Sequence, residues 1–366
     1  MHLKKIKLTN FKNYPVASFE FDEKLNCIVG NNGMGKTNLL DSIYYLCMGK
    51  SHFSLPDKNV VLHEETFFRL EGDFQLDNKK HKVVAKVIPG KKKVIENNNV
   101  PYKKLMEHIG LLPVVMIVPD DTRLATEGSE GRRKFLDNAL SQLDKEYLIQ
   151  LVRYHSLLKQ RNAALKQFAK SKTFDYKLIK TYSEQMAGPA KIIFDKRKAF
   201  IENWLPEFLK LYALISGATE QVDCKYVSKL ADADFMYLTE EAEEKDRILA
   251  RTTVGIHKDD LDFQIEGYPL KKFASQGQLK SFVLASKLAL YEILKNKKNC
   301  NPVFLLDDIF DKLDKHRVKH LLKLLIDKEI GQVFISDTHE NRVVDIIKEF
   351  DVSHRRFIID KQSGTN

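Results

Sequence analysis

The feature of this sequence that most constrains its fold is a glycine-rich octet near the N-terminus, which matches the pattern G-x-x-x-x-G-K-[ST] at every required position. The octet is Gly30-Asn31-Asn32-Gly33-Met34-Gly35-Lys36-Thr37. Residues 25–29 predict a buried strand before it, and residues 39–46 place apolar side chains at helical spacing after it. Glycines let backbone N–H groups curl around phosphate oxygens, and a helix N-terminus adds about half a positive charge. We therefore predict that Lys36 contacts the β- and γ-phosphates of a bound nucleotide, and that Thr37 supplies a hydroxyl to Mg²⁺.

An apolar run that ends in two acids, Asp307 and Asp308, supplies the second part of a nucleotide site. We expect Asp307 to hold Mg²⁺, directly or through water, and Asp308 to orient or deprotonate the attacking water. Octet and acids together are typical of P-loop NTPases, which include kinases, GTPases and motors. The next residues resemble a loop of ABC ATPases in which an Asp or a neighbour crosses a dimer interface, and a helix N-cap at Asp311 or Asp314 explains them equally well. They are Ile309-Phe310-Asp311-Lys312-Leu313-Asp314.

The segment Ser275-Gln276-Gly277-Gln278 narrows the class. It begins a helical stretch, precedes Asp307 by 32 residues (307 − 275), and resembles the ABC signature Leu-Ser-Gly-Gly-Gln. Ala274 and Gln276 depart from the first and third positions of that signature. A serine at a helix N-terminus can donate to a γ-phosphate, although an ordinary serine cap is the alternative. The order of motifs favours an ABC-type ATPase, in which Ser275, Gly277 and Gln278 contact the nucleotide held by a second copy.

Further segments resemble the RecF family of SMC-like ATPases, from residue 1 to about residue 340. The resemblance implies an ABC-type head with a short helical lobe in place of the SMC coiled coil. It also implies an ATP-dependent homodimer on single-stranded or gapped duplex DNA, weak DNA-stimulated ATP hydrolysis, and RecR-like and RecO-like mediator partners. The implied roles are replication, recombinational repair and the SOS response. The segments are Leu8-Thr9-Asn10-Phe11-Lys12-Asn13, Pro119-Asp120-Asp121, Gly128, Arg132-Arg133-Lys134-Phe135-Leu136-Asp137, Leu158-Lys159-Gln160-Arg161-Asn162-Ala163-Ala164-Leu165 and Gly255-Ile256-His257-Lys258-Asp259-Asp260-Leu261.

Three positions depart from the usual ABC pattern. Asp308 stands where many ABC ATPases have Glu. The region near Pro119 has no evident Gln, so Asp120 or a neighbour is the candidate metal sensor. His339 lies slightly late for the switch histidine, and Asp337 or Thr338 are alternatives for that place.

The chain length and patterning predict an α/β fold interrupted by a mainly helical insertion. The 366 residues exceed what a single core usually supports. The pattern predicts a β-ribbon over residues 66–105, around the turn at Pro89-Gly90, and helices over residues 130–215. We expect an ATPase lobe in two pieces, residues 1–125 with the ribbon and residues 251–366, separated by a helical lobe at residues 126–250.

The charge balance predicts a polyanionic partner, because the formal net charge is +10 and the pI is near 9.1. Residues 79–104 hold nine lysines against one acid, and residues 147–174 hold basic residues and no acid. Each tract is equally well explained as a solvated face. No motif that reads bases is present, so we expect DNA contacts to phosphates rather than to particular bases. The candidate contacts are Lys91, Lys92, Lys93, Lys159 and Arg161.

Other interpretations of the sequence are less consistent with it. A transporter's nucleotide-binding subunit shares the motifs, but its gap between octet and signature is much shorter than the 238 residues found here (275 − 37). A small-molecule kinase leaves the signature unexplained. No apolar run is long enough to span a bilayer, and the basic N-terminus lacks the apolar region of a signal peptide. The four scattered cysteines predict neither a zinc site nor disulfides, so we expect a cytoplasmic protein without a membrane partner.

Overall fold

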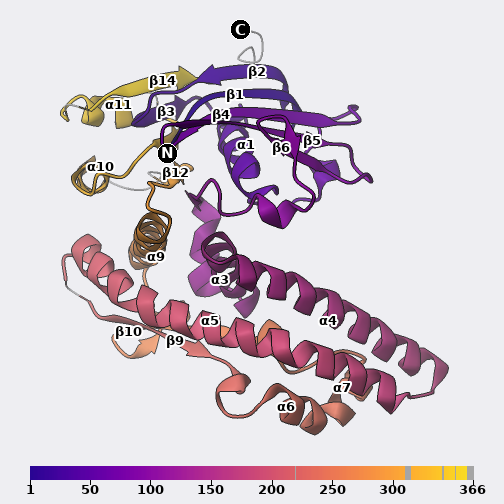
Figure 1. Ribbon diagram of the computed structural model, residues 1–366. Coiled ribbons are helices and arrows are strands. Elements are labelled where there is room, and N and C mark those ends of the chain that lie inside the picture. Colours follow the sequence, from indigo (N-terminus) through magenta and orange to yellow (C-terminus); the bar gives the residue numbers. More distant parts are fainter. Residues whose placement is uncertain (219, 310–314, 340–341, 351, 361–366) are drawn as a thin grey trace. The chain divides into compact units, whose positions relative to one another are not determined.

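The computed structural model describes residues 1–218, 220–309, 315–339, 342–350 and 352–360, and divides into two compact units (Figure 1). The first unit holds residues 1–121 and 290–366, and the second holds residues 122–289. A helical insertion between two α/β pieces agrees with the sequence. The second unit extends to Ala289 rather than ending at 250, because a small sheet and the first part of helix α9 (Gln276–Lys298) pack within it.

A five-stranded parallel sheet forms the centre of the first unit. Its strand order is β14-β3-β13-β12-β8, and all its described pairs are parallel. The central strands are buried along their whole length, as expected for a sheet covered on both faces. Their carboxyl ends, where the octet and the acidic pair lie, share one edge. The strands are β3 (Leu25–Val29), β8 (Val114–Ile117), β12 (Val303–Leu306), β13 (Val333–Asp337) and β14 (His354–Ile358).

An antiparallel sheet of order β2-β1-β4-β5-β6-β7 completes the first unit. Helix α1 (Lys36–Met48) packs against strands of both sheets, and its apolar residues join the common core. The expected β-ribbon is confirmed, and its turn lies at Pro89-Gly90 between β5 and β6. The antiparallel strands are β1 (His2–Phe11), β2 (Tyr14–Glu20), β4 (Phe68–Leu76), β5 (Lys79–Val87), β6 (Val94–Asn97) and β7 (Val100–Pro101), and the remaining helices are α10 (Lys315–Asp327) and α11 (Arg342–Ile347).

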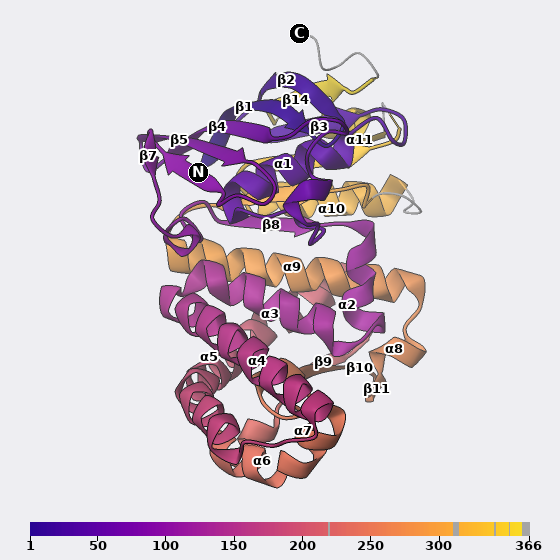
Figure 2. The same cartoon turned by 90° about the vertical axis from the view of Figure 1, so that its right-hand side faces the viewer.

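The second unit is built on two long helices, α4 (Lys145–Ser171) and α5 (Tyr176–Ser216), which lie side by side (Figure 2). Asp144 and Asp175 cap their N-termini by accepting hydrogen bonds from Tyr147 and Leu178 backbone N–H groups. A three-stranded sheet of order β11-β10-β9 packs beside them. The other elements are α2 (Arg123–Thr126), α3 (Ser129–Leu143), β9 (Val222–Val227), α6 (Phe235–Glu241), α7 (Glu243–Leu249), β10 (Asp260–Ile265), β11 (Tyr268–Pro269) and α8 (Leu270–Phe273).

A stacked aromatic core holds α9 in the second unit. Trp204 and Phe208 of α5 stack with ring centroids 4.6 Å apart, and Phe208 meets Phe282 of α9 edge-on at 4.9 Å. The Trp204 indole N–H donates to the Ser286 carbonyl at 3.2 Å, which satisfies the one polar atom of this buried ring. The helix that begins with the signature is therefore anchored to α5.

Two of the segments that resemble RecF, residues 132–137 and 255–261, meet in a buried ionic network in the second unit. Arg197, which is 1% exposed, donates to the carboxylates of Asp137 and Asp259 at 2.8 Å each. Arg132 pairs with Asp260 at 2.6 Å. Removing one partner of such a buried pair costs roughly 3–5 kcal/mol, because an uncompensated charge remains inside. These segments therefore specify how the helical unit is assembled.

Among the described residues, every helix is too short or too polar to cross a bilayer.

Candidate functional site

The glycine-rich octet forms a turn between β3 and α1, with three glycines at positive φ. Gly30 has φ +149°, and a Cβ there would meet the Ile359 carbonyl oxygen at 2.3 Å, so only glycine fits. The Lys36 ammonium donates to the carbonyls of Gly30 at 2.6 Å and Asn31 at 3.0 Å. Burial lowers the pKa of Lys36, and the nearby carboxylates oppose that shift. The lysine is thus held over the turn as a localised positive charge.

The sheet brings Thr37 and Asp307 together, although 270 residues separate them. The Thr37 hydroxyl donates to Asp307 Oδ2 at 2.8 Å, and Asp307 is 4% exposed. Burial raises the pKa of the Asp307 carboxyl, while hydrogen bonds from Ser336 and Thr37 favour its charged form. One hydroxyl and one carboxylate are the oxygen donors that Mg²⁺ takes when a nucleotide and water complete its shell. The donor set therefore fits the predicted metal site.

Ser336, which sequence reasoning missed, organises the two acids. Its hydroxyl donates to Asp307 Oδ1 at 2.6 Å and accepts from the Asp308 backbone N–H at 2.8 Å. Asp308 has φ +45°, in the left-handed region that is uncommon for residues other than glycine, and this hydrogen bond supports it there. The sequence places Ser336 only near the end of a strand, and its role depends on the pairing of that strand, β13, with β12.

The turn between β1 and β2 braces the octet, a role that the sequence did not reveal. Asn13 donates to the Met34 carbonyl at 2.9 Å and accepts from the Asn38 amide at 2.7 Å. The Tyr14 hydroxyl donates to the Gly35 carbonyl at 3.1 Å. The opening segment of the chain therefore helps to fix the shape of the phosphate-binding turn.

The candidate sensor residues lie near this edge of the sheet. Asp120 is exposed in a 3-10 turn (Pro119–Thr122) that follows β8. Asp337 is buried at the end of β13, Thr338 is half-buried, and His339 is exposed and donates its backbone N–H to Asp337 Oδ1 at 2.9 Å. Which of them acts as switch or sensor stays a prediction. Of the predicted interface loop after Asp308, residues 310–314 lie outside the described residues.

The signature-like segment lies at the start of α9, where Ser275 and Gln276 are exposed and Gly277 and Gln278 are half-buried. The Ser275 backbone N–H donates to Gln278 Oε1 at 2.6 Å, and the Gln278 backbone N–H donates to Ser275 Oγ at 3.2 Å. This reciprocal pair is a capping box. It leaves Ser275 accessible at a helix N-terminus, which a contact to a phosphate requires.

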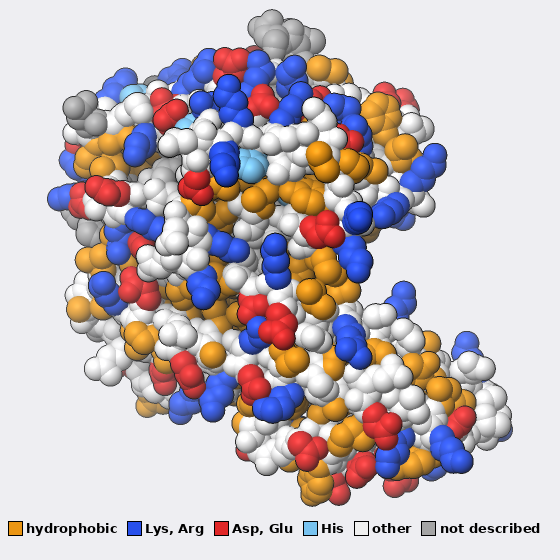
Figure 3. Space-filling model, viewed as in Figure 1, with side chains coloured by type: hydrophobic (Ala, Val, Ile, Leu, Met, Phe, Trp, Pro, Cys, Tyr) orange, Lys and Arg blue, Asp and Glu red, His pale blue; other side chains and the backbone are white. Residues whose placement is uncertain are grey.

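The two basic tracts contain both exposed and internally bound side chains. Lys91, Lys92 and Lys159 are exposed, and basic side chains gather over β5 and β6 (Figure 3). Lys93 instead donates to the Gly49 carbonyl at 2.9 Å and pairs with Asp57 at 3.1 Å.

The prediction of Arg161 as a DNA contact is wrong. Its guanidinium is 1% exposed and donates to Asp246 at 2.7 Å and to the Thr252 hydroxyl at 2.8 Å, so it belongs to the core of the second unit.

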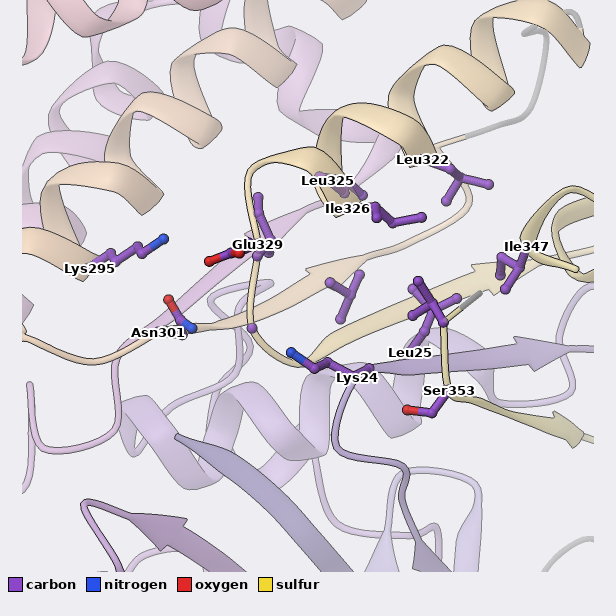
Figure 4. Close-up of a pocket in the computed structure, with 14 residues that line it drawn as sticks. Lys24, Leu25, Lys295, Asn301, Leu322, Leu325, Ile326, Glu329, Ile347 and Ser353 are labelled. Atoms are coloured by element: carbon purple, nitrogen blue, oxygen red, sulfur yellow. The ribbon is translucent and has the colours of Figure 1, made fainter. Parts of the chain in front are cut away.

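A cavity of about 520 Å³ in the first unit lies away from this site (Figure 4). Leu25 and Val333, which begin β3 and β13, line it together with α10 residues such as Leu322 and Ile326. Ligands of open α/β sheets bind outside the carboxyl ends of the strands, whereas this cavity is at the amino ends. The carboxyl edge is therefore the candidate site.

Comparison with known proteins agrees with this geometry. The sequence matches the family described as RecF/RecN/SMC N terminal domain over residues 2–356. It is 45% identical to the DNA replication and repair protein RecF of Flavobacterium johnsoniae, over 98% of this chain and 99% of that protein. It is 42% identical to RecF of Cytophaga hutchinsonii, over 99% of this chain and 96% of that protein.

Solved structures show the same relationship. The chain resembles a structure of the recombination mediator protein RecF-ATP in the RecFOR pathway, with a TM-score of 0.88, 29% identity, and coverage of 98% of this chain and 96% of that one. A SmcHead bound to the C-winged helix domain of ScpA shares the fold alone, with a TM-score of 0.53, 16% identity, and coverage of 94% and 92%. The fold is an α/β ABC-type, SMC-like ATPase head with a helical insertion. The chain belongs to the RecF family of DNA replication and repair proteins.

Proposed function

We propose that this protein uses ATP to close a homodimer on DNA, and acts in that form in replication, recombinational repair and the SOS response. One observation carries the proposal: Lys36, Thr37, Asp307 and Ser336 meet at one edge of the parallel sheet, although they come from opposite ends of the chain. The likeness to a RecF structure named for ATP and the RecFOR pathway supports ATP as the ligand, and RecR-like and RecO-like proteins as partners.

Each residue at this edge has a defined task in the proposed reaction. Lys36 binds the β- and γ-phosphate oxygens, and the turn N–H groups bind the others. Mg²⁺, held by Thr37 and Asp307, would neutralise charge on the phosphates. Asp308 orients the attacking water, and Ser336 keeps both acids in position. Ser275 of a second copy contacts the γ-phosphate, so that ATP links the two copies.

The proposed DNA contacts are Lys91, Lys92 and Lys159, because exposed lysines suit phosphates of any sequence. We propose a weak ATPase that DNA stimulates, since a switch that holds DNA needs slow turnover rather than fast chemistry. A transporter subunit is not favoured, because the chain matches RecF proteins over nearly their whole length.

DNA affinity and oligomeric state, measured together with and without ATP, test this function. We expect ATP to produce a dimer and to raise affinity for single-stranded or gapped duplex DNA. In Lys36→Ala both effects should disappear, because losing one partner of a desolvated charge pair costs roughly 2–5 kcal/mol. DNA affinity that is independent of ATP in the parent protein would refute the proposal.

A further inference from the structure

The side chain of Gln278 is shared between the signature turn and a neighbouring acid. Its Oε1 accepts from the Ser275 backbone N–H at 2.6 Å, and its Nε2 donates to Glu220 Oε1 at 2.8 Å. These partners dictate the orientation of the Gln278 amide, because the Ser275 N–H needs an acceptor and the Glu220 carboxylate needs a donor. Glu220 therefore selects the orientation in which Gln278 caps Ser275.

Glu220 is itself fixed from the other side. Its Oε2 accepts a hydrogen bond from the Tyr212 hydroxyl at 2.6 Å. Tyr212 lies in the last turns of α5, is 1% exposed, and its ring is 6.4 Å from that of Phe282 in α9. Burial, and after it the bond to Glu220, raises the pKa of the Tyr212 hydroxyl, so it remains a donor. The carboxylate thus joins the end of α5 to the start of α9.

The backbone after Glu220 is also held in place. The Gln221 N–H donates to Glu266 Oε1 at 2.5 Å, and the Glu266 N–H donates to the Gln221 carbonyl at 2.8 Å. Strand β9 begins at the next residue, Val222. Glu220 therefore approaches Gln278 from a segment anchored to the small sheet.

We propose that Glu220 is a positioning residue for the signature: it holds Gln278 in the amide orientation that places Ser275 for contact with the nucleotide of a second copy. The inference rests on the proposed function. Glu220 need not contact ATP, because it acts through Gln278. Charge-assisted hydrogen bonds are stronger than neutral ones, so the bond from Gln278 to the Glu220 carboxylate is stronger than a bond between two neutral side chains would be.

The hydrogen-bonding pattern can be tested by exchanging the side chains at positions 220 and 278. In Glu220→Gln the new amide keeps its oxygen toward Tyr212 and turns its NH₂ group toward the NH₂ group of Gln278. A flip of Gln278 relieves that clash but directs its NH₂ at the Ser275 N–H. In Gln278→Glu two carboxylates face each other. The double exchange, Glu220→Gln with Gln278→Glu, restores every bond, since the new amide at position 220 donates to the new carboxylate at position 278, which also accepts from the Ser275 N–H.

The experiment measures ATP-dependent dimerisation by sedimentation, together with ATP affinity of the monomer and thermal midpoint. We expect Glu220→Gln to weaken dimerisation about tenfold or more, as for loss of a hydrogen bond to a charged group. Monomer ATP affinity should stay at the parent value, whereas the thermal midpoint should fall by a few degrees because a charge-assisted contact between α5 and α9 is lost. The double exchange should recover the thermal midpoint because it restores the hydrogen bonds, and Tyr212→Phe should show a smaller loss of dimerisation because it removes only the anchor. Glu244→Gln, an exposed acid of α7, is the matched control.

Two results would overturn the inference while leaving the proposed function intact. One is a parent that dimerises on ATP and a Glu220→Gln variant that does so equally well. The other is a Glu220→Gln variant that loses monomer ATP affinity together with dimerisation, which would make the effect structural rather than specific to the signature. A parent that never dimerises on ATP would instead refute the proposed function itself, and the inference with it.

Discussion

Asp307 and Asp308 are adjacent in the chain, but the local structure gives them different environments. Asp307 is buried and accepts hydrogen bonds from Thr37 and Ser336. Asp308 is half-buried, and its backbone adopts the left-handed conformation, which directs its side chain differently from that of Asp307. One acid is thus suited to hold a metal, and the other to act on water.

Asp308→Asn should leave ATP bound but unhydrolysed. The amide cannot accept a proton from water, while Thr37 and Asp307 would still hold the metal, so the ATP-bound dimer should accumulate. Because a positioned acid or base contributes about 10²–10⁴ to the rate, turnover should fall by at least about 100-fold. Single-turnover hydrolysis and sedimentation measure the two effects. Hydrolysis at the parent rate would show that Asp308 does not orient the water.

Ser336→Ala removes the hydroxyl that joins the two acids. The Asp308 backbone N–H then loses its acceptor, and unfolding should become easier by about 1–3 kcal/mol. We also expect kcat to fall more than ATP affinity, because the octet that binds most of the triphosphate is unchanged. Ser336→Thr keeps the hydroxyl and is the matched control. Equal losses in both variants would mean that volume, rather than the hydrogen bonds, matters at this position.

At the scale of elements, the β5–β6 hairpin presents lysines of two kinds. Lys91 and Lys92 are exposed, whereas Lys93 is bound to Asp57 and the Gly49 carbonyl. Replacing Lys91 and Lys92 by Ala should weaken DNA binding about equally across sequences and flatten the salt dependence by roughly 0.9 in log–log slope for each phosphate that the variant no longer neutralises. Lys297→Ala with Lys323→Ala, two exposed lysines outside the tract, provides the control. An unchanged slope would identify the hairpin as a solvated surface.

Helix α4 shows what could and could not be predicted from the sequence. Its helical character follows from the local pattern over residues 130–215. The absence of acids in this tract favours Arg161 as a DNA contact, but the residue lies four positions from both Leu157 and Leu165, on the buried stripe. That spacing was available in the sequence. Its partner Asp246 was not, because 85 residues separate the two and only tertiary packing brings them together.

The same limit applies at the carboxyl edge of the parallel sheet: contacts within a motif could be predicted, and contacts between distant segments could not. The octet and the acids were predictable because each motif carries its chemistry within a few adjacent residues. The bracing by Asn13 and Tyr14, and the bridge made by Ser336, were not, because they depend on how separate strands are ordered in the sheets. The boundary at Ala289 is not marked in the sequence, because it falls within the continuous helix α9.

At the scale of the whole molecule, the central claim is that ATP joins two copies through the signature. The octet and the acidic pair belong to the first unit, and Ser275 stands exposed on the second. Ser275→Arg leaves Lys36 and Thr37 untouched, so ATP binding to the monomer should stay nearly unchanged. A bulky side chain at this helix start cannot fit beside Gly277 and a nucleotide, so dimerisation should fail. ATP turnover and any ATP-dependent gain in DNA affinity should fall with it.

Sedimentation of the parent protein and of Ser275→Arg, each with and without ATP, is the most direct test of this claim. The account predicts a parent that changes from monomer to dimer when ATP is added, and a variant that binds ATP but remains a monomer. A variant that still dimerises on ATP, or a parent that never does, would contradict it and would reduce the segment from Ser275 to Gln278 to an ordinary helix cap.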